Sequence, residues 1–134
     1  MGQSDSTILV VDDEPGMREF LEIMLQKDGY NVETAPDGSE AIDKIEEKLF
    51  DLAIVDIQMP VLNGIEAACR LRTLSSSARV IFLTVHMDSE FVEAALAAGA
   101  LGYVVKPSLA TDLVPAIWAA MEGNTFISPS MQLQ

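Results

Sequence analysis

The chain has 134 residues, of which 8 are Lys or Arg and 21 are Asp or Glu, so its formal net charge is -13. Hydrophobic residues make up 49% of it, which excludes a disordered chain and suffices for one compact domain. The single cysteine excludes an internal disulfide and a cysteine-based zinc site. Because acidic residues dominate and basic residues form no cluster, we expect no direct binding of nucleic acid by this chain.

The sequence contains no candidate for a membrane-spanning segment or a secretory signal. No apolar run reaches the roughly 18 residues that a membrane span needs, and residues 1–6 lack a basic and apolar segment. We therefore expect a cytoplasmic protein that does not contact a membrane. Residues 1–6 are expected to form a disordered leader, residues 7–122 one domain, and residues 123–134 a C-terminal extension or the start of a linker.

Short apolar runs rich in β-branched residues alternate with segments of helical period. The predicted strands are residues 8–11, 32–35, 52–55, 80–83 and 103–105. This alternation is typical of a parallel sheet that helices cover on both faces. The sequence therefore predicts an α/β fold, with a doubly wound five-stranded parallel sheet and five helices.

The first two helices carry clear boundary signals. Pro15 suits the first turn of a helix and Gly29 suits a C-terminal cap, and the apolar stripe between them is Met17, Phe20, Leu21, Met24 and Leu25. Asp37 followed by Glu40 is similar to a capping box. The residues of the second helix that should face the core are Ala41, Ile42, Ile45 and Leu49.

Three further helices are predicted with less regular signals. The third opens at Asn63-Gly64 and carries Cys69 on the side that faces the protein core, and the fourth covers about residues 89–98. The fifth covers roughly residues 110–122 and contains Pro115, which lacks a backbone donor, so this helix either starts near Thr111 or bends at the proline. Trp118 on this helix belongs either to the core or to a partner surface.

Polar residues follow four of the predicted strands at their carboxyl ends, which meet at one edge of a doubly wound sheet. Asp12 and Asp13 follow the first strand, Asp56 the third, Thr84 the fourth and Lys106 the fifth. Crowded carboxylates repel one another unless a positive charge offsets them. Oxygen ligands without Cys or His favour a hard cation, so we predict a Mg²⁺ site.

An acidic cluster with one hydroxyl and one amine suits the chemistry of a phosphoryl group. The cation and the ammonium neutralise the phosphoryl oxygens while a carboxylate attacks phosphorus. Asp56 is the best nucleophile candidate because it stands alone after the most central apolar strand, whereas the adjacent Asp12 and Asp13 are better suited to hold the ion.

Five separated motifs together resemble the receiver domain of response regulators in two-component systems, over about residues 7–122. They are Val11-Asp12-Asp13-Glu14-Pro15, Asp56-Ile57-Gln58-Met59-Pro60, Asn63-Gly64, Thr84 and Gly102-Tyr103-Val104-Val105-Lys106-Pro107. The resemblance implies a flavodoxin-like fold with strand order 2-1-3-4-5. It also implies that Asp56 accepts a phosphoryl group from a sensor histidine kinase or a phosphotransferase.

The resemblance assigns roles to the other site residues. Asp13, Asp56 and the backbone carbonyl of Gln58 would bind Mg²⁺ directly, and Asp12 would act mainly through a coordinated water. Thr84 and Lys106 would contact the phosphoryl oxygens. Tyr103 resembles the aromatic switch that follows the movement of Thr84, and the bond between Lys106 and Pro107 resembles the cis peptide of the family.

Residues 63–67, 99–103 and 126–129 are most similar to the NarL/FixJ subfamily. Members of that subfamily usually continue into a LuxR-type DNA-binding domain, so we favour the receiver part of a transcription regulator. The alternative is a stand-alone receiver or phosphorelay protein. The resemblance leaves the formation of a homodimer open.

Two other functions compete with the signalling switch. A metal-dependent phosphatase would use the same nucleophile, but such enzymes generally have a second carboxylate two residues later, where this chain has Gln58. A phosphate-independent protein-binding domain is disfavoured because the acidic residues, Thr84 and Lys106 are all present. We therefore expect a switch that phosphorylates and slowly dephosphorylates itself, and no turnover enzyme.

Overall fold

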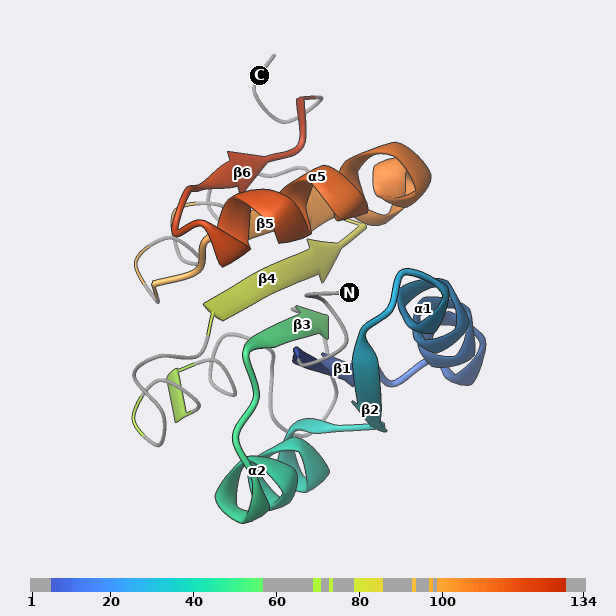
Figure 1. Cartoon of the computed structure of the whole chain (residues 1–134), viewed down its shortest axis with the longest axis vertical. Helices are drawn as coiled ribbons and strands as arrows, with labels where there is room; N and C mark the ends of the chain where they lie inside the picture. Colours follow the sequence, from blue (N-terminus) through green and yellow to red (C-terminus); the bar gives the residue numbers. More distant parts are fainter. Residues whose placement is uncertain are drawn as a thin grey trace.

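The computed structural model describes residues 6–56, 69–70, 73, 79–85, 93, 97 and 99–129. Its centre is one parallel sheet with the strand order β2-β1-β3-β4-β5-β6, shown in Figure 1. The strands are β1 (Thr7–Val11), β2 (Asn31–Ala35), β3 (Leu52–Asp56), β4 (Arg79–Thr84), β5 (Gly102–Val105) and β6 (Phe126–Ile127). The predicted α/β class and the order of the first five strands are confirmed.

Helices cover both faces of this sheet. The helical elements are α1 (Pro15–Lys27), α2 (Gly38–Glu47), the 3-10 turn η2 (Lys106–Ser108) and α5 (Leu109–Met121). Two separate apolar clusters form, one joining α1 and α5 to the sheet and the other joining α2 to the opposite face. Within the described part of the chain, no helix is both long and apolar enough to cross a membrane.

Helix α1 begins and ends where its sequence predicts. Pro15 is its first residue, and Gly29 follows with a φ of 94°, a conformation that only glycine adopts without strain. Leu21 and Leu25 are fully buried. Phe20 was predicted to face inward, but it is 47% exposed. Leu21 and Leu25 form the buried centre of the apolar stripe, Met17 and Met24 pack against the core in part, and Phe20 lies at the margin of the stripe.

Helix α2 starts with the predicted cap, since the side chain of Asp37 accepts a hydrogen bond of 2.9 Å from the amide of Glu40. Ala41 and Ile45 are buried as predicted. The prediction for Leu49 is wrong, because this side chain is 79% exposed. The helix ends at Glu47 and the next residue is extended, so the helical period stops before Leu49.

Helix α5 contains a proline in its interior. It begins at Leu109, close to the predicted start at about residue 110, so the alternative of a late start near Thr111 is excluded, and Pro115 lies inside the helix on its exposed face. On that face the carbonyl that lacks its usual helical donor can bond to water. Trp118 is 58% exposed, which assigns it to the surface and not to the core.

The predicted third and fourth helices lie mostly outside the described residues. Cys69 is described and is exposed, so its predicted place in the core is wrong. A single exposed apolar side chain is common, because apolar atoms contribute about 55–60% of a folded protein's accessible surface.

The chain after α5 returns to the sheet. Phe126 and Ile127 pair in parallel with Gly102 and Tyr103, and this adds β6 outside β5. The sequence predicted no strand here, because two residues are too few to show an alternating pattern.

Candidate functional site

Three carboxylates meet at the carboxyl edge of the sheet. Asp12 directly follows β1, Asp13 comes next, and Asp56 ends β3, the strand that pairs with β1. One ligand oxygen from each lies within 4.8 Å of the others. Asp12 and Asp56 are buried, whereas Asp13 is exposed. The structure therefore brings the predicted acidic cluster together, and Asp13 is its solvent-exposed member.

The main chain and side chain of Asp12 are held by several contacts. Its amide donates to the carbonyl of Ala35 at 3.2 Å, which continues the pairing of β1 with β2. Its Oδ1 accepts a hydrogen bond of 2.9 Å from the amide of Glu14, and its carbonyl accepts one of 2.8 Å from Nη1 of Arg18. These bonds fix the loop that carries both Asp12 and Asp13.

Lys106 supplies the positive charge within the cluster. Its Nζ lies 3.0 Å from Oδ2 of Asp12 and 3.3 Å from Oδ2 of Asp56, and its side chain is only 14% exposed. Burial lowers the pKa of Lys106, but the hydrogen bonds and negative charges of Asp12 and Asp56 outweigh burial and raise the pKa above its usual value. The ammonium therefore stays charged at neutral pH.

The cluster fits a hard divalent cation. Its donor atoms are carboxylate oxygens that already lie close together. Oδ2 of Asp12 is buried, and the ammonium of Lys106 lies 3.0 Å from it. Three carboxylates face one ammonium, so a net negative charge remains for a cation to neutralise. The Gln58 carbonyl predicted as a further ligand lies outside the described residues.

Thr84 and Tyr103 lie on the adjacent strands β4 and β5. Thr84 pairs with Val105, and Phe82 pairs with Tyr103. Because side chains alternate along a strand, all four belong to the same face of the sheet. Thr84 is 1% exposed and Tyr103 is fully buried. The hydroxyl at the site edge and the aromatic ring are thus one diagonal step apart in a packed layer.

The predicted cis peptide between Lys106 and Pro107 is wrong, because the described residues contain no cis peptide bond. The two residues open the turn η2, where Pro107 occupies one of the first positions. A trans proline is well suited to that place, since its missing amide proton has no partner to lose in the first turn.

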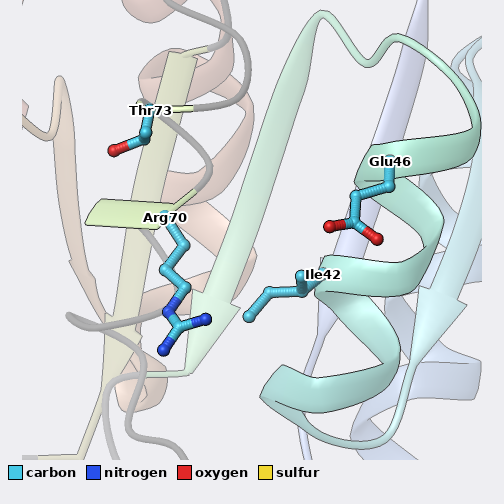
Figure 2. A pocket seen from close by; sticks show the side chains of 4 residues that line it. All are labelled: Ile42, Glu46, Arg70 and Thr73. Atoms are coloured by element: carbon cyan, nitrogen blue, oxygen red, sulfur yellow. The ribbon is translucent and has the colours of Figure 1, made fainter.

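A hollow whose lining includes none of the three carboxylates of the acidic cluster lies beside α2. Its volume is about 320 Å³, and it is lined by Ile42, Glu46, Arg70 and Thr73. Figure 2 shows Ile42 and Glu46 projecting from α2 and the side chain of Arg70 extending toward Ile42. These residues supply one acid and one base, so we assign no chemistry to this hollow.

The sequence alone did not reveal the role of Arg18. Its guanidinium reaches back from the first turns of α1 to the end of β1. The only feature of the sequence that indicates this contact is the position of Arg18, about one helical turn after the acidic loop. Surface arginines at such positions are common.

Comparison with known proteins identifies the class of this site. Residues 8–118 match the family model of the response regulator receiver domain, and the chain belongs to this family. The chain is 36% identical over 117 residues to the DNA-binding response regulator MtrA of Mycolicibacterium smegmatis, a match that covers 87% of this chain and 51% of MtrA.

Two solved structures show the same fold. A LuxR-family two-component response regulator from Aurantimonas sp. has a TM-score of 0.89 and 35% identity, with 96% of this chain and 93% of that chain covered. The response regulator TrrA of Thermotoga maritima, solved in complex with Mg²⁺ and BeF, has a TM-score of 0.75 and 38% identity, with 87% and 98% covered. This chain spans about half the length of the first curated relatives it matches.

Proposed function

We propose that this chain is a phosphorylation-operated switch in which Asp56 accepts the phosphoryl group. One observation carries the proposal: the oxygens of Asp12, Asp13 and Asp56 lie within 4.8 Å of one another, and Lys106 contacts two of these carboxylates. Of the three acids, Asp56 alone belongs to β3, which lies at the centre of the sheet between β1, which Asp12 follows, and β4, which Thr84 ends.

In the proposed reaction, a carboxylate oxygen of Asp56 forms a bond to phosphorus while the bond from phosphorus to the imidazole nitrogen of a phosphohistidine breaks. The electron pair of that bond stays on the nitrogen, so the histidine leaves and an acyl phosphate remains on Asp56. The ammonium of Lys106 would move from the carboxylates to one phosphoryl oxygen, and the hydroxyl of Thr84 would donate a hydrogen bond to another phosphoryl oxygen.

Asp12, Asp13 and Asp56 would hold Mg²⁺, with the carbonyl of Gln58 as the further ligand that the family resemblance implies. When bound, the ion neutralises negative charge on the phosphoryl oxygens as they approach the carboxylates. The TrrA structure with Mg²⁺ and BeF supports this part of the proposal by similarity.

The switch itself would run through β4 and β5. Movement of Thr84 toward a phosphoryl oxygen would free space in the layer that it shares with Tyr103, and the ring would turn into that space. Phosphorylation would then alter the affinity of the nearby surface for a partner. We propose no turnover of an external substrate, so the chain would not be an enzyme in that sense.

The proposed phosphoryl donor is a sensor histidine kinase or phosphotransferase in the cytoplasm. We further propose that the chain is the receiver part of a longer transcription regulator, because the curated relatives are longer. A LuxR-type DNA-binding partner domain is supported by the motifs and by the Aurantimonas structure. Formation of a homodimer after phosphorylation would fit such a regulator.

The test is incubation with a phosphohistidine kinase and Mg²⁺. The wild-type chain should gain one phosphoryl group that is stable in acid and labile in base, as an acyl phosphate is. Asp56→Asn should gain none, whereas the control Asp43→Asn, which alters an exposed carboxylate on α2, should react like wild type. Full incorporation into Asp56→Asn would remove Asp56 from its role.

A further inference from the structure

The segment that follows α5 is attached to β5 beside the candidate site. The amide of Phe126 donates to the carbonyl of Leu101 at 2.8 Å, and the amide of Ser128 donates to the carbonyl of Tyr103 at 2.9 Å. Ser128 is fully buried. Figure 1 shows this segment returning along the outer edge of the sheet next to β5.

A side chain makes the last bond of this attachment. The hydroxyl oxygen of Ser128 accepts a buried hydrogen bond of 3.1 Å from the amide of Val105. In a continued parallel ladder, that amide would bond to the main-chain carbonyl of Ser128. The hydroxyl takes the place of that carbonyl, so this bond depends on the identity of one residue and a single substitution can remove it.

We propose that Ser128 is a positioning residue for Lys106. Val105 comes directly before Lys106, and β5 ends between them as the chain turns into η2. On one side Val105 is paired with Thr84 of β4, and on the other its amide is held by Ser128. The hydrogen bond that Val105 donates to Ser128 therefore fixes the backbone from which the side chain of Lys106 extends to Asp12 and Asp56.

The bonds of Ser128 also connect the candidate site to the part of the chain after residue 128. Ser128 bonds to Tyr103 and to Val105, the second and the last residue of β5. A movement of Lys106 or Tyr103 would change the strength of these bonds. By linkage, a movement of the segment would change the ligand affinity of the site. This inference rests on the proposed function only where it concerns phosphoryl binding.

The test compares Ser128→Ala with the control Thr125→Ala, which removes an exposed hydroxyl from the same segment. In the protein without ligands, Ser128→Ala should speed amide exchange at Val105 and shift the NMR signal of the Lys106 ammonium. With Mg²⁺ and beryllofluoride, its affinity for beryllofluoride should fall about fivefold, as expected for a lost buried hydrogen bond. Its affinity for Mg²⁺ alone should not fall, since Lys106 is no metal ligand and its ammonium competes with the cation for the carboxylates.

A double-mutant cycle separates positioning from a loss of stability. In a Lys106→Met background, Ser128→Ala should cause no further loss of beryllofluoride affinity. If Ser128→Ala does not fold, Ser128→Cys provides a weaker acceptor and should give the same changes at smaller size. An unchanged Lys106 signal in the folded variant would overturn the inference. If wild type binds no beryllofluoride, the proposed function fails, while the Lys106 signal still decides this inference.

Discussion

The ammonium of Lys106 lies 3.0 Å from the carboxylate of Asp12, although the strands that carry them are not neighbours. β3 and β4 separate β1 from β5, so the lysine side chain crosses the carboxyl edge of two strands and passes Asp56 on the way. The same charge therefore balances two carboxylates that a metal ion and a phosphoryl group would also engage. If both ligands bind as proposed, this shared use would make Lys106 the residue through which they influence each other.

Replacing Lys106 by methionine should separate the two ligands. Because the ammonium competes with a cation for the carboxylates, Lys106→Met should bind Mg²⁺ about tenfold more tightly, which corresponds to about 1.4 kcal/mol. Phosphoryl uptake should nevertheless slow by about a hundredfold, since a charge that stabilises the phosphoryl oxygens is lost. Fluorescence or calorimetric Mg²⁺ titration and the rate of phosphorylation measure the two effects.

The matched control is Lys44→Met, which changes a lysine that pairs with Glu33 on another part of the fold. It should leave both the affinity for Mg²⁺ and the rate unchanged. Weaker binding of Mg²⁺ by Lys106→Met would show that the lysine supports the cation site and does not compete with it.

Gly102 in β5 should tolerate no side chain. A Cβ there would lie 2.8 Å from Cγ1 of Ile81, a fully buried residue of β4. Gly102→Ala should therefore lower the free energy of unfolding by about 1 to 3 kcal/mol. Gly16→Ala, where a Cβ would meet nothing within 4 Å, should raise it by about 0.5 to 1 kcal/mol in α1. Urea denaturation of both variants checks the contrast, and equal effects would contradict it.

Glu33 should contribute a small, pH-dependent stability. Its carboxylate pairs with Lys48 and Lys44, and the hydrogen bond from Lys48 is the main cause that lowers the pKa of Glu33 below 4.5. A lowered pKa stabilises the fold above pH 4.5, and this contribution is lost as the pH falls through the pKa of the folded state. Glu33→Gln should therefore cost about 0.5 to 1 kcal/mol at pH 7, the range of partly exposed ion pairs.

Unfolding experiments from pH 7 down to pH 3 test this prediction. The difference between wild type and Glu33→Gln should shrink below pH 4.5, while the exposed control Glu19→Gln should show little difference throughout. A difference that grows on acidification would contradict the sign of the pKa shift.

Thr84→Ala should separate phosphorylation from signalling. The substitution leaves all three carboxylates in the chain, so Asp56 should still accept phosphate. The moving hydroxyl is gone, and the response of the Tyr103 ring to beryllofluoride should largely disappear. The NMR signals of the Tyr103 ring report this directly. Equal ring responses in wild type and Thr84→Ala would mean that the coupling follows another route.

Much of the fold follows from local patterns in the sequence. The strands are apolar and rich in β-branched residues, and the boundaries of α1 follow from Pro15 and Gly29. Errors occur where burial depends on the angle at which a helix meets the sheet, as for Phe20, or on where the helix stops, as for Leu49. A one-dimensional period cannot report either quantity.

The candidate site was predictable to a similar degree. Parallel strands bring their carboxyl ends to one edge, so Asp12, Asp56 and Lys106 were expected together before any distance was known. The contacts of Arg18 and Ser128 were not predictable, because each depends on a single hydrogen bond between segments without a repeated pattern.

The most direct test of the central claim is to locate the phosphoryl group after incubation with a phosphohistidine donor and Mg²⁺. Peptide mapping by mass spectrometry, after chemical reduction of the acyl phosphate, distinguishes Asp56 from Asp12 and Asp13 because β1 and β3 lie on different peptides. The account predicts one modified residue per chain, at Asp56. Modification at Asp12 or Asp13, or none in a chain that binds Mg²⁺, would contradict it.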